Sequence, residues 1–241
     1  MWVLSTPLYI TQPVIWLCFA PDPLYVLTPP VLSAERITDS LWKLLTATLS
    51  TRFEKPVKTI RQLIPKTTLF NHYGRAYRLE GGDTMHGCEL IQLQSDSRDM
   101  SFVRVSHATG DFWLSPAYIN SFLFQFQLLV DKYANQQRRA PEFELQDFYG
   151  QILRFLVVDI PDSQAQADLE IETGSLAYAV IRQINLLDEI AGGIKYYKDL
   201  GPIIFVDLNQ VKCVIGRVMD RGKWAIIDRC TNTFTREHVG H

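Results

Sequence analysis

The sequence lacks the short motifs that identify many enzyme families. It contains no GxSxG, HExxH, CxxC or GxxxxGK[ST] run and no kinase-type glycine loop. These absences remove the usual sequence support for a serine-hydrolase elbow, a zinc-protease site, a dithiol motif and a P-loop. Any catalytic site would therefore have to be assembled by the fold from residues far apart in the chain.

An excess of charge of either sign is also missing. The 241 residues include 24 Lys and Arg and 26 Asp and Glu, a formal net charge of −2. No overall field therefore favours nucleic acid or an anionic membrane, and a basic binding surface would have to be local. The hydrophobic fraction of 47% is that of a globular protein.

Closely spaced cysteines are absent. Cys18, Cys88, Cys213 and Cys230 are scattered along the chain, whereas small secreted domains held by disulfides are dense in cysteine. We therefore expect free thiols and an intracellular location.

Long apolar runs are absent as well. Residues 1–32 hold one charged side chain, Asp22, but six prolines interrupt them. No run approaches the roughly 20 residues that span a bilayer, and residues 1–32 lack the basic n-region of a signal peptide. We predict no membrane span. Residues 1–32 are interpreted as extended segments on the protein body, as a leader that does not order, or as an error in the gene model.

Helical patterns are confined to residues 33–70. Ser33 is the predicted N-cap of a helix that runs to Ser50 with an apolar stripe. Pro56 is predicted to start a second helix, which Pro65 ends. The most basic stretch of the chain lies here, with Lys55, Lys58, Arg61 and Lys66. A solvated helix surface is the favoured interpretation, and a phosphate-contacting surface is the alternative.

Residues 71–140 change to β patterns. The runs HYGRAYRL, ELIQL and SFVRV are predicted strands, and residues 122–130 alternate with period two, which indicates another. The loop of residues 81–87 holds Asp83 and His86 near Cys88. A glycine turn is favoured there over a metal site, which would need further ligands. The polar run DKYANQQRRAP is the predicted connection between two halves.

Residues 141–230 contain five further predicted strands: QILRFLVVDIP, SLAYAVIRQI, PIIFVDL, KCVIGRV and KWAIID, with a hairpin turn at DRGK. No helical pattern is long enough for crossovers, so the strands are expected to be antiparallel. The predicted fold is mainly β with an N-terminal helical segment (α+β). The C-terminal half is expected to form a small antiparallel barrel or rolled sheet, and residues 231–241 a frayed tail.

Three aspartates follow apolar runs: Asp159, Asp207 and Asp228. In nucleases and transferases of the RNase H type, such carboxylates hold two Mg²⁺ ions that clamp the attacking and leaving oxygens. The sheet expected here lacks crossover helices, however, and Asp228 ends a strand where a helical residue would be needed. Aspartate after a strand commonly caps a turn. Turn capping is therefore favoured, and a metal-dependent catalytic site is the alternative.

Arginines and aromatic residues are interspersed in the C-terminal half. On a small barrel such side chains contact phosphates and stack on bases, or they bind a peptide. A role in the core and in solvated turns is the alternative. The candidate phosphate contacts are Arg154, Arg182, Arg217 and Arg221, and the candidate stacking residues are Tyr196, Tyr197 and Trp224.

Four segments occur in the order Arg78–Cys88, Arg98–Arg104, Leu128–Pro161 and Tyr196–Arg229. This order resembles the C-terminal region of uncharacterised fungal proteins encoded in or near DNA transposons. It is also similar to the tail of large transposases of the Kyakuja–Dileera–Zisupton and CACTA types, where a β-rich tail follows an RNase H-like core. The resemblance implies a transposon-derived protein without that core, with the nucleus as a candidate location. It matches no catalytic residue of the family to a position here.

The leading hypothesis is therefore a non-enzymatic, transposon-derived β-rich domain that binds nucleic acid, with DNA as the candidate, or a protein partner, without metal or cofactor. A metal-dependent nuclease-like enzyme is the first alternative. A structural remnant without selected activity is the second.

Overall fold

The computed structural model describes residues 15–17, 25–79, 82–93, 98–105, 129–131, 143–145, 147–160, 166, 169, 174–187 and 194–228. Within them, eleven strands form one antiparallel sheet. These are β1 (Ile15–Leu17), β2 (Tyr25–Glu35), β3 (Phe70–Arg78), β4 (Met85–His86), β5 (Phe102–Val105), β8 (Phe148–Asp159), β9 (Ser175–Leu186), β10 (Tyr196–Asp207), β11 (Val211–Val214), β12 (Gly216–Asp220) and β13 (Lys223–Ile227). Two strands form a second sheet, β6 (Leu129–Asp131) and β7 (Phe143–Leu145). The helices are α1 (Asp39–Arg52), α2 (Val57–Leu63) and the 3₁₀ turn η1 (Leu208–Gln210).

The large sheet has the strand order β1-β2-β3-β8-β9-β10-β13-β12, with β4, β5 and β11 branching from it. Strands from both sides of the predicted connection near residue 140 thus belong to one sheet. Residues 25–32, part of the predicted leader, lie in β2 and pair with β3. The mainly β, α+β prediction is confirmed. The sheet of the described residues is open, since β1 and β12, at the two ends of its path, do not pair with each other, and a closed barrel stays a prediction.

The long strand β8 changes neighbours along its length. Its residues 148–151 pair with β5, and its residues 155–157 pair with β3. A register shift between Ile152 and Arg154 marks a bulge at the change. The backbone N–H of Cys88 donates to the Ile152 carbonyl at 3.0 Å, so the segment after β4 fills the gap between β3 and β5.

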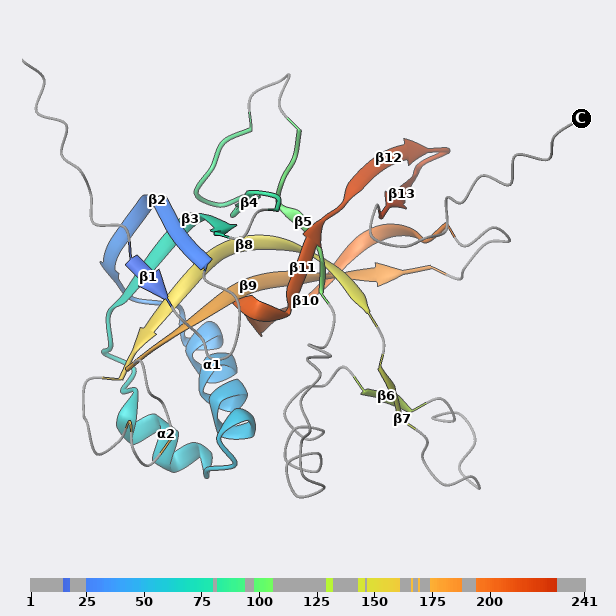
Figure 1. The fold of residues 1–241 in the computed structure, drawn as a ribbon. Coiled ribbons are helices and arrows are strands. Elements are labelled where there is room, and N and C mark those ends of the chain that lie inside the picture. The colour runs from blue at the N-terminus through green and yellow to red at the C-terminus, as the bar shows by residue number, and fades with distance from the viewer. Residues whose placement is uncertain are drawn as a thin grey trace, which may run out of the picture.

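Two apolar layers lie on opposite sides of β8 and β9. One packs α1 and α2 against the sheet through residues such as Leu45, Ile60 and Leu156. The other lies under β2, β5 and β11 and includes Phe155 and Ile181. Figure 1 shows the helices on one side of β8 and β9, with β4 and β5 on the other. No helix within the described residues has the length and apolar character needed to cross a membrane.

The helix predictions are partly correct. The second helix starts after Pro56 and ends before Pro65, as predicted. The first is capped by Thr38, whose side chain accepts from the Leu41 N–H at 3.3 Å, and the predicted cap Ser33 is wrong. Ser33 lies in β2, between Leu32 and Glu35, which pair with His72 and Phe70 of β3, so this segment belongs to the sheet.

The strand predictions for the C-terminal half are confirmed, with KCVIGRV divided into β11 and β12. The predicted strand ELIQL is wrong, because the Leu90 and Ile91 N–H groups both donate to the Gly87 carbonyl at 3.1 Å and close a turn. Of the alternating run at 122–130, only residues 129 and 130 are described, in β6. Of the predicted connection at 131–141, only Asp131 is described, in β6, and the predicted tail at 231–241 lies outside the described residues.

Candidate binding site at the β12–β13 hairpin

Arg217, Tyr197 and Trp224, three of the predicted binding residues, come together where β10, β13 and β12 pair. Trp224 of β13 lies opposite Tyr197 of β10 on one side and Met219 of β12 on the other. Arg217 Nη1 donates to the Tyr197 hydroxyl at 3.2 Å. The Arg217 Cζ atom lies 3.7 Å from the Phe102 ring centroid and 4.5 Å from that of Trp224. The guanidinium is therefore enclosed by aromatic rings and is a structural anchor.

The charge of Arg217 is balanced within the protein. Arg217 Nη2 lies 2.8 Å from Asp99 Oδ2, and Asp99 also accepts from the Ser101 N–H at 3.0 Å. Tyr197 is buried, and this burial raises the pKa of its hydroxyl although Arg217 opposes the shift. Because the cation is paired and the ring is covered, Arg217 and Tyr197 are not arranged to bind phosphate and base.

Tyr196 and Arg221 lie around the hairpin tip. The Tyr196 hydroxyl donates to Asp220 Oδ2 at 3.2 Å. Arg221 and Gly222 have φ angles of 48° and 77°, which are those of a type I′ turn, and the predicted hairpin at DRGK is confirmed. The Arg221 side chain is 95% exposed.

Arg154 and Arg182 lie elsewhere, on β8 and β9. Arg154 Nη2 forms an ion pair with Glu89 Oε2 at 2.5 Å. Arg182 is exposed, opposite Gln151 of β8. Two of the four predicted phosphate contacts, Arg154 and Arg217, are therefore engaged by carboxylates of the same chain.

The three predicted catalytic aspartates each have a separate environment. Asp207 accepts from Arg52 of α1, whose Nη1 also donates to the Tyr178 hydroxyl at 2.9 Å. Asp159 accepts from Ser175 Oγ at 2.7 Å, across the start of β9.

Asp228 is bound at the other end of β8. It accepts from the Tyr149 hydroxyl at 3.1 Å and from Arg104 Nη1 at 3.2 Å. Burial and the Asp228 carboxylate raise the pKa of Tyr149, and Arg104 Nε lies 3.0 Å from a second carboxylate, that of Asp147.

The aspartates are too far apart for one metal site. Tyr149, which bonds Asp228, and Asp159 are both on β8 and ten positions apart, which at the rise of an extended strand is about 30 Å. Paired catalytic metals lie about 4 Å apart. In the described part of the chain, no group of three His, Cys, Asp or Glu residues could hold a metal ion. The three aspartates therefore do not form the metal clamp of the alternative hypothesis.

The loop that carries Asp83, His86 and Cys88 is packed on the sheet. A Cβ atom on Gly87 would lie 2.8 Å from the Leu153 carbonyl oxygen, so the backbone approaches β8 closely. Burial, with the nearby Glu89 and Asp99 carboxylates, raises the pKa of the Cys88 thiol to about 11. Cys88 is therefore a thiol at neutral pH and lacks the thiolate of a reactive cysteine.

Sequence reasoning missed the two most exposed apolar side chains of the site, Val218 and Met219. They are 55% and 51% exposed and adjacent on β12, so they face opposite sides of the hairpin. The available signal was two neighbouring apolar residues directly before a hairpin turn. A strand with one face on the core and the other in water alternates apolar and polar residues. Two adjacent apolar residues break this alternation in β12.

The outer edge of β12 is not paired with any described strand. In a hairpin closed by two residues, the residues flanking the turn exchange both hydrogen bonds, and bonded positions then alternate. Asp220 faces Lys223 across the turn, so Asp220 and Val218 bond to β13. The backbone N–H and C=O groups of Arg217 and Met219 therefore point toward the open edge.

Comparison with protein-family models, with curated proteins and with solved structures finds no match for this chain.

Proposed function

We propose that this chain is a non-enzymatic protein-binding domain that adds an extended segment of a partner protein to the edge of β12. The observation that carries the proposal is the open edge of β12 together with the exposed Val218 and Met219. Strand addition obtains affinity from backbone hydrogen bonds and specificity from alternate side chains. Exposed edge strands without a covering element are recognised sites for such pairing.

The chemistry of the hairpin favours a peptide over nucleic acid as its ligand. The guanidinium of Arg217 is paired with Asp99, and Asp220 adds a carboxylate beside the tip. Phosphates require unpaired cations, and stacking requires an accessible ring face, whereas Tyr197 is buried. A transposon-derived origin is part of the proposal and is supported by the order of the segments Arg78–Cys88 and Tyr196–Arg229.

The hairpin is well suited to present this edge because it is fixed to the body. Arg217 connects β12 to the segment of β5 through Phe102 and Asp99. A rigid edge loses less conformational entropy on binding than a mobile one. The partner strand would bond to the backbone of Arg217 and Met219, with the Met219 and Val218 side chains contacting it from the two faces.

The test uses Met219→Pro, with Met219→Ala as the matched control. Proline removes the N–H group that points toward the open edge and leaves the hydrogen bonds between β12 and β13 in place. Peptides would be selected from a displayed library of random ten-residue sequences and their dissociation constants measured by fluorescence polarisation. We expect Met219→Pro to weaken binding at least about tenfold and Met219→Ala to weaken it by a smaller factor.

Hydrogen exchange gives a second readout of the same test. Bound peptide should slow exchange at the Arg217 and Met219 amides, because these are the groups that the added strand would bond. If no peptide is selected, or if selected peptides bind Met219→Pro as tightly as the original chain, strand addition at β12 is wrong.

A further inference from the structure

The helical segment carries a charge opposite to that of the rest of the chain. Residues 33–70 hold seven Lys and Arg and three Asp and Glu, a formal charge of +4, although the whole chain has −2. The remaining residues therefore have a formal charge of −6. Basic charge in this protein is local and concentrated on α1, α2 and their connection.

Five of these cations are exposed and form no ion pair with another described residue; one, Arg36, precedes α1, and four lie on the helices or their connection. These four are Lys43, Lys55, Lys58 and Arg61. The other cations of the helices are engaged, since Arg52 bonds Asp207 and Lys66 lies 2.5 Å from Asp39. A carboxylate or phosphate from outside the chain would therefore meet four cations that the protein itself has not neutralised.

The backbone holds three of these cations close together. Lys58 and Arg61 are three positions apart on α2, and side chains at this spacing are neighbours on a helix surface. Lys55 precedes Pro56, the N-cap of α2, and its carbonyl accepts from Ser50 Oγ at 2.6 Å. This hydrogen bond holds the connection between the helices against the last turns of α1. The backbone that carries these cations is therefore fixed in position.

The contact between the helices also fixes Arg61. Its Cζ atom lies 5.0 Å from the centroid of the Trp42 ring of α1. Trp42 Nε1 donates to the Ile64 carbonyl at 3.0 Å, which joins α1 to the end of α2. Arg61 therefore presents its charge from a defined position.

The surroundings of the cations indicate the kind of anion. Among the described residues, no large apolar side chain of α1 or α2 is exposed, whereas a helix that binds a membrane surface needs one. Trp42 and Phe53, the aromatic residues nearby, are half-buried and covered by arginine side chains, so no free ring is available for stacking on single-stranded bases. What remains is a charged, polar surface suited to a regular array of phosphates.

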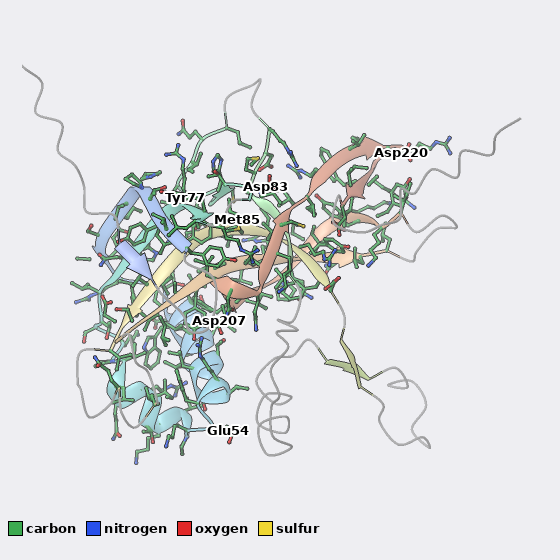
Figure 2. The ribbon with its side chains drawn as sticks, viewed as in Figure 1. Glu54, Tyr77, Asp83, Met85, Asp207 and Asp220 are labelled. Atoms are coloured by element: carbon green, nitrogen blue, oxygen red, sulfur yellow. The ribbon has the colours of Figure 1, made fainter. Side chains whose placement is uncertain are left out.

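We infer that Lys43, Lys55, Lys58 and Arg61 form a binding surface for the phosphate backbone of duplex nucleic acid, independent of base sequence. This surface is distinct from the β12 edge. Figure 2 shows Glu54, at the connection between the helices, and Asp220, at the hairpin tip, at opposite ends of the molecule. One chain can therefore hold a protein partner at one end and a duplex at the other.

The experiment measures binding of a fluorescent 16-base-pair DNA duplex by polarisation at several salt concentrations. Duplex RNA and single-stranded DNA of the same sequence are the comparison ligands. The test variant is Lys55→Gln with Lys58→Gln, which leaves the packing of Arg61 on Trp42 unchanged. We expect at least about tenfold weaker duplex binding at low salt and a slope of log K against log salt that is smaller by about 1.8, or 0.9 for each lost phosphate contact.

The matched control is Lys223→Gln with Arg221→Gln, which removes two positive charges from the hairpin. This control and Met219→Pro should both bind the duplex as tightly as the original chain does. Strand addition at β12 and duplex binding at the helices are therefore tested independently of each other. The inference is overturned if the original chain does not bind either duplex, if single strands bind more tightly, or if the hairpin control loses as much affinity as the helix variant. Circular dichroism of each variant verifies that the fold is retained.

Discussion

The guanidinium of Arg52, in the last turn of α1, donates a hydrogen bond to the carboxylate of Asp207, the residue at which β10 ends. The same Nη1 atom donates to the Tyr178 hydroxyl, and the Tyr178 ring lies edge-on to Phe205 at 6.2 Å between centroids. This charged contact thus joins helix and sheet beside the apolar layer that contains Tyr178 and Phe205. This assigns Asp207 a structural role that its position after a strand did not reveal.

Asp207→Ala is expected to lower the free energy of unfolding by about 3 kcal/mol, because it removes the carboxylate that lies against the Arg52 guanidinium beside buried Tyr178. Asp159→Ala is the control, since Asp159 is exposed and accepts one hydrogen bond from Ser175. Asp159→Ala should lower the free energy of unfolding by less than about 1 kcal/mol. Urea unfolding measures both. Equal losses would contradict the structural role of Asp207.

Arg217→Lys is expected to cost about 1–2 kcal/mol of unfolding free energy. A lysine keeps the charge but cannot place a planar group between Phe102 and Trp224 while bonding Asp99. Arg221→Lys, at the exposed turn, should leave stability unchanged within about 0.5 kcal/mol. Chemical denaturation of the two variants side by side tests this, and an unaffected Arg217→Lys would show that the aromatic enclosure contributes nothing.

His72 should make the fold sensitive to acid. Its side chain is 0% exposed and neither ring nitrogen has a hydrogen-bond partner among the described residues. Burial, and then the positive charge of Arg154, lower the pKa of His72 to about 4 from 6.5. The pKa of His72 is lower in the folded state than in the unfolded state. The stability that the fold has with His72 neutral is therefore fully present above pH 6.5 and is lost as the pH falls toward 4.

Between pH 7.5 and pH 4.5, His72 is expected to lower the free energy of unfolding by about 2 kcal/mol. His72→Leu should remove this share of the pH dependence of stability. The shares that come from the carboxylates and from His86 will remain. Urea midpoints at the two pH values for the original chain and the variant give the comparison. Parallel pH profiles of the two proteins would rule out a buried neutral His72.

Gly87→Ala is expected to destabilise the fold by about 2 kcal/mol or more. The added Cβ atom would lie 2.8 Å from the Leu153 carbonyl oxygen and 2.9 Å from the Arg154 Cα, both of which are backbone atoms. Gly216→Ala is a milder change, since its nearest contact is 3.3 Å from a side-chain atom of Ile227. Thermal unfolding should rank the Gly87 variant below the Gly216 variant, and the reverse order would be inconsistent with this packing.

Local patterns predicted the elements whose stability is local. Proline at 56 and 65 bounded α2, and the DRGK run specified the two-residue turn between β12 and β13. Ser33 was a plausible cap because its own neighbourhood favours a helix start, but the pairing of β2 with β3 decides its conformation. Such pairing involves residues far away in the chain and leaves no mark on a single segment.

The candidate site was predictable only in part for the same reason. The sequence places Arg217 and Trp224 in strands that were correctly expected, whereas Tyr197 precedes the predicted strand PIIFVDL and lies in the longer β10; the structure brings the three together. It does not reveal that Asp99, 118 positions before Arg217, neutralises its charge. Whether an arginine contacts a ligand or holds the fold together depends on such a partner. The pairing of Arg217 with Asp99 decides this for the site, and the sequence does not show it.

The pairing of β5 with β11 has a consequence for synthesis of the chain on the ribosome. Val105 lies opposite Val211, 106 positions later. At translation rates of about 5–20 residues per second, β5 emerges about 5–20 s before the strand that covers its edge. Both edges of β5 are open to other chains until its neighbour β8 is synthesised, more than 40 positions later, and one edge stays open until β11 follows. The nascent chain can therefore associate with other chains through β5 in the period between synthesis of residues 105 and 211.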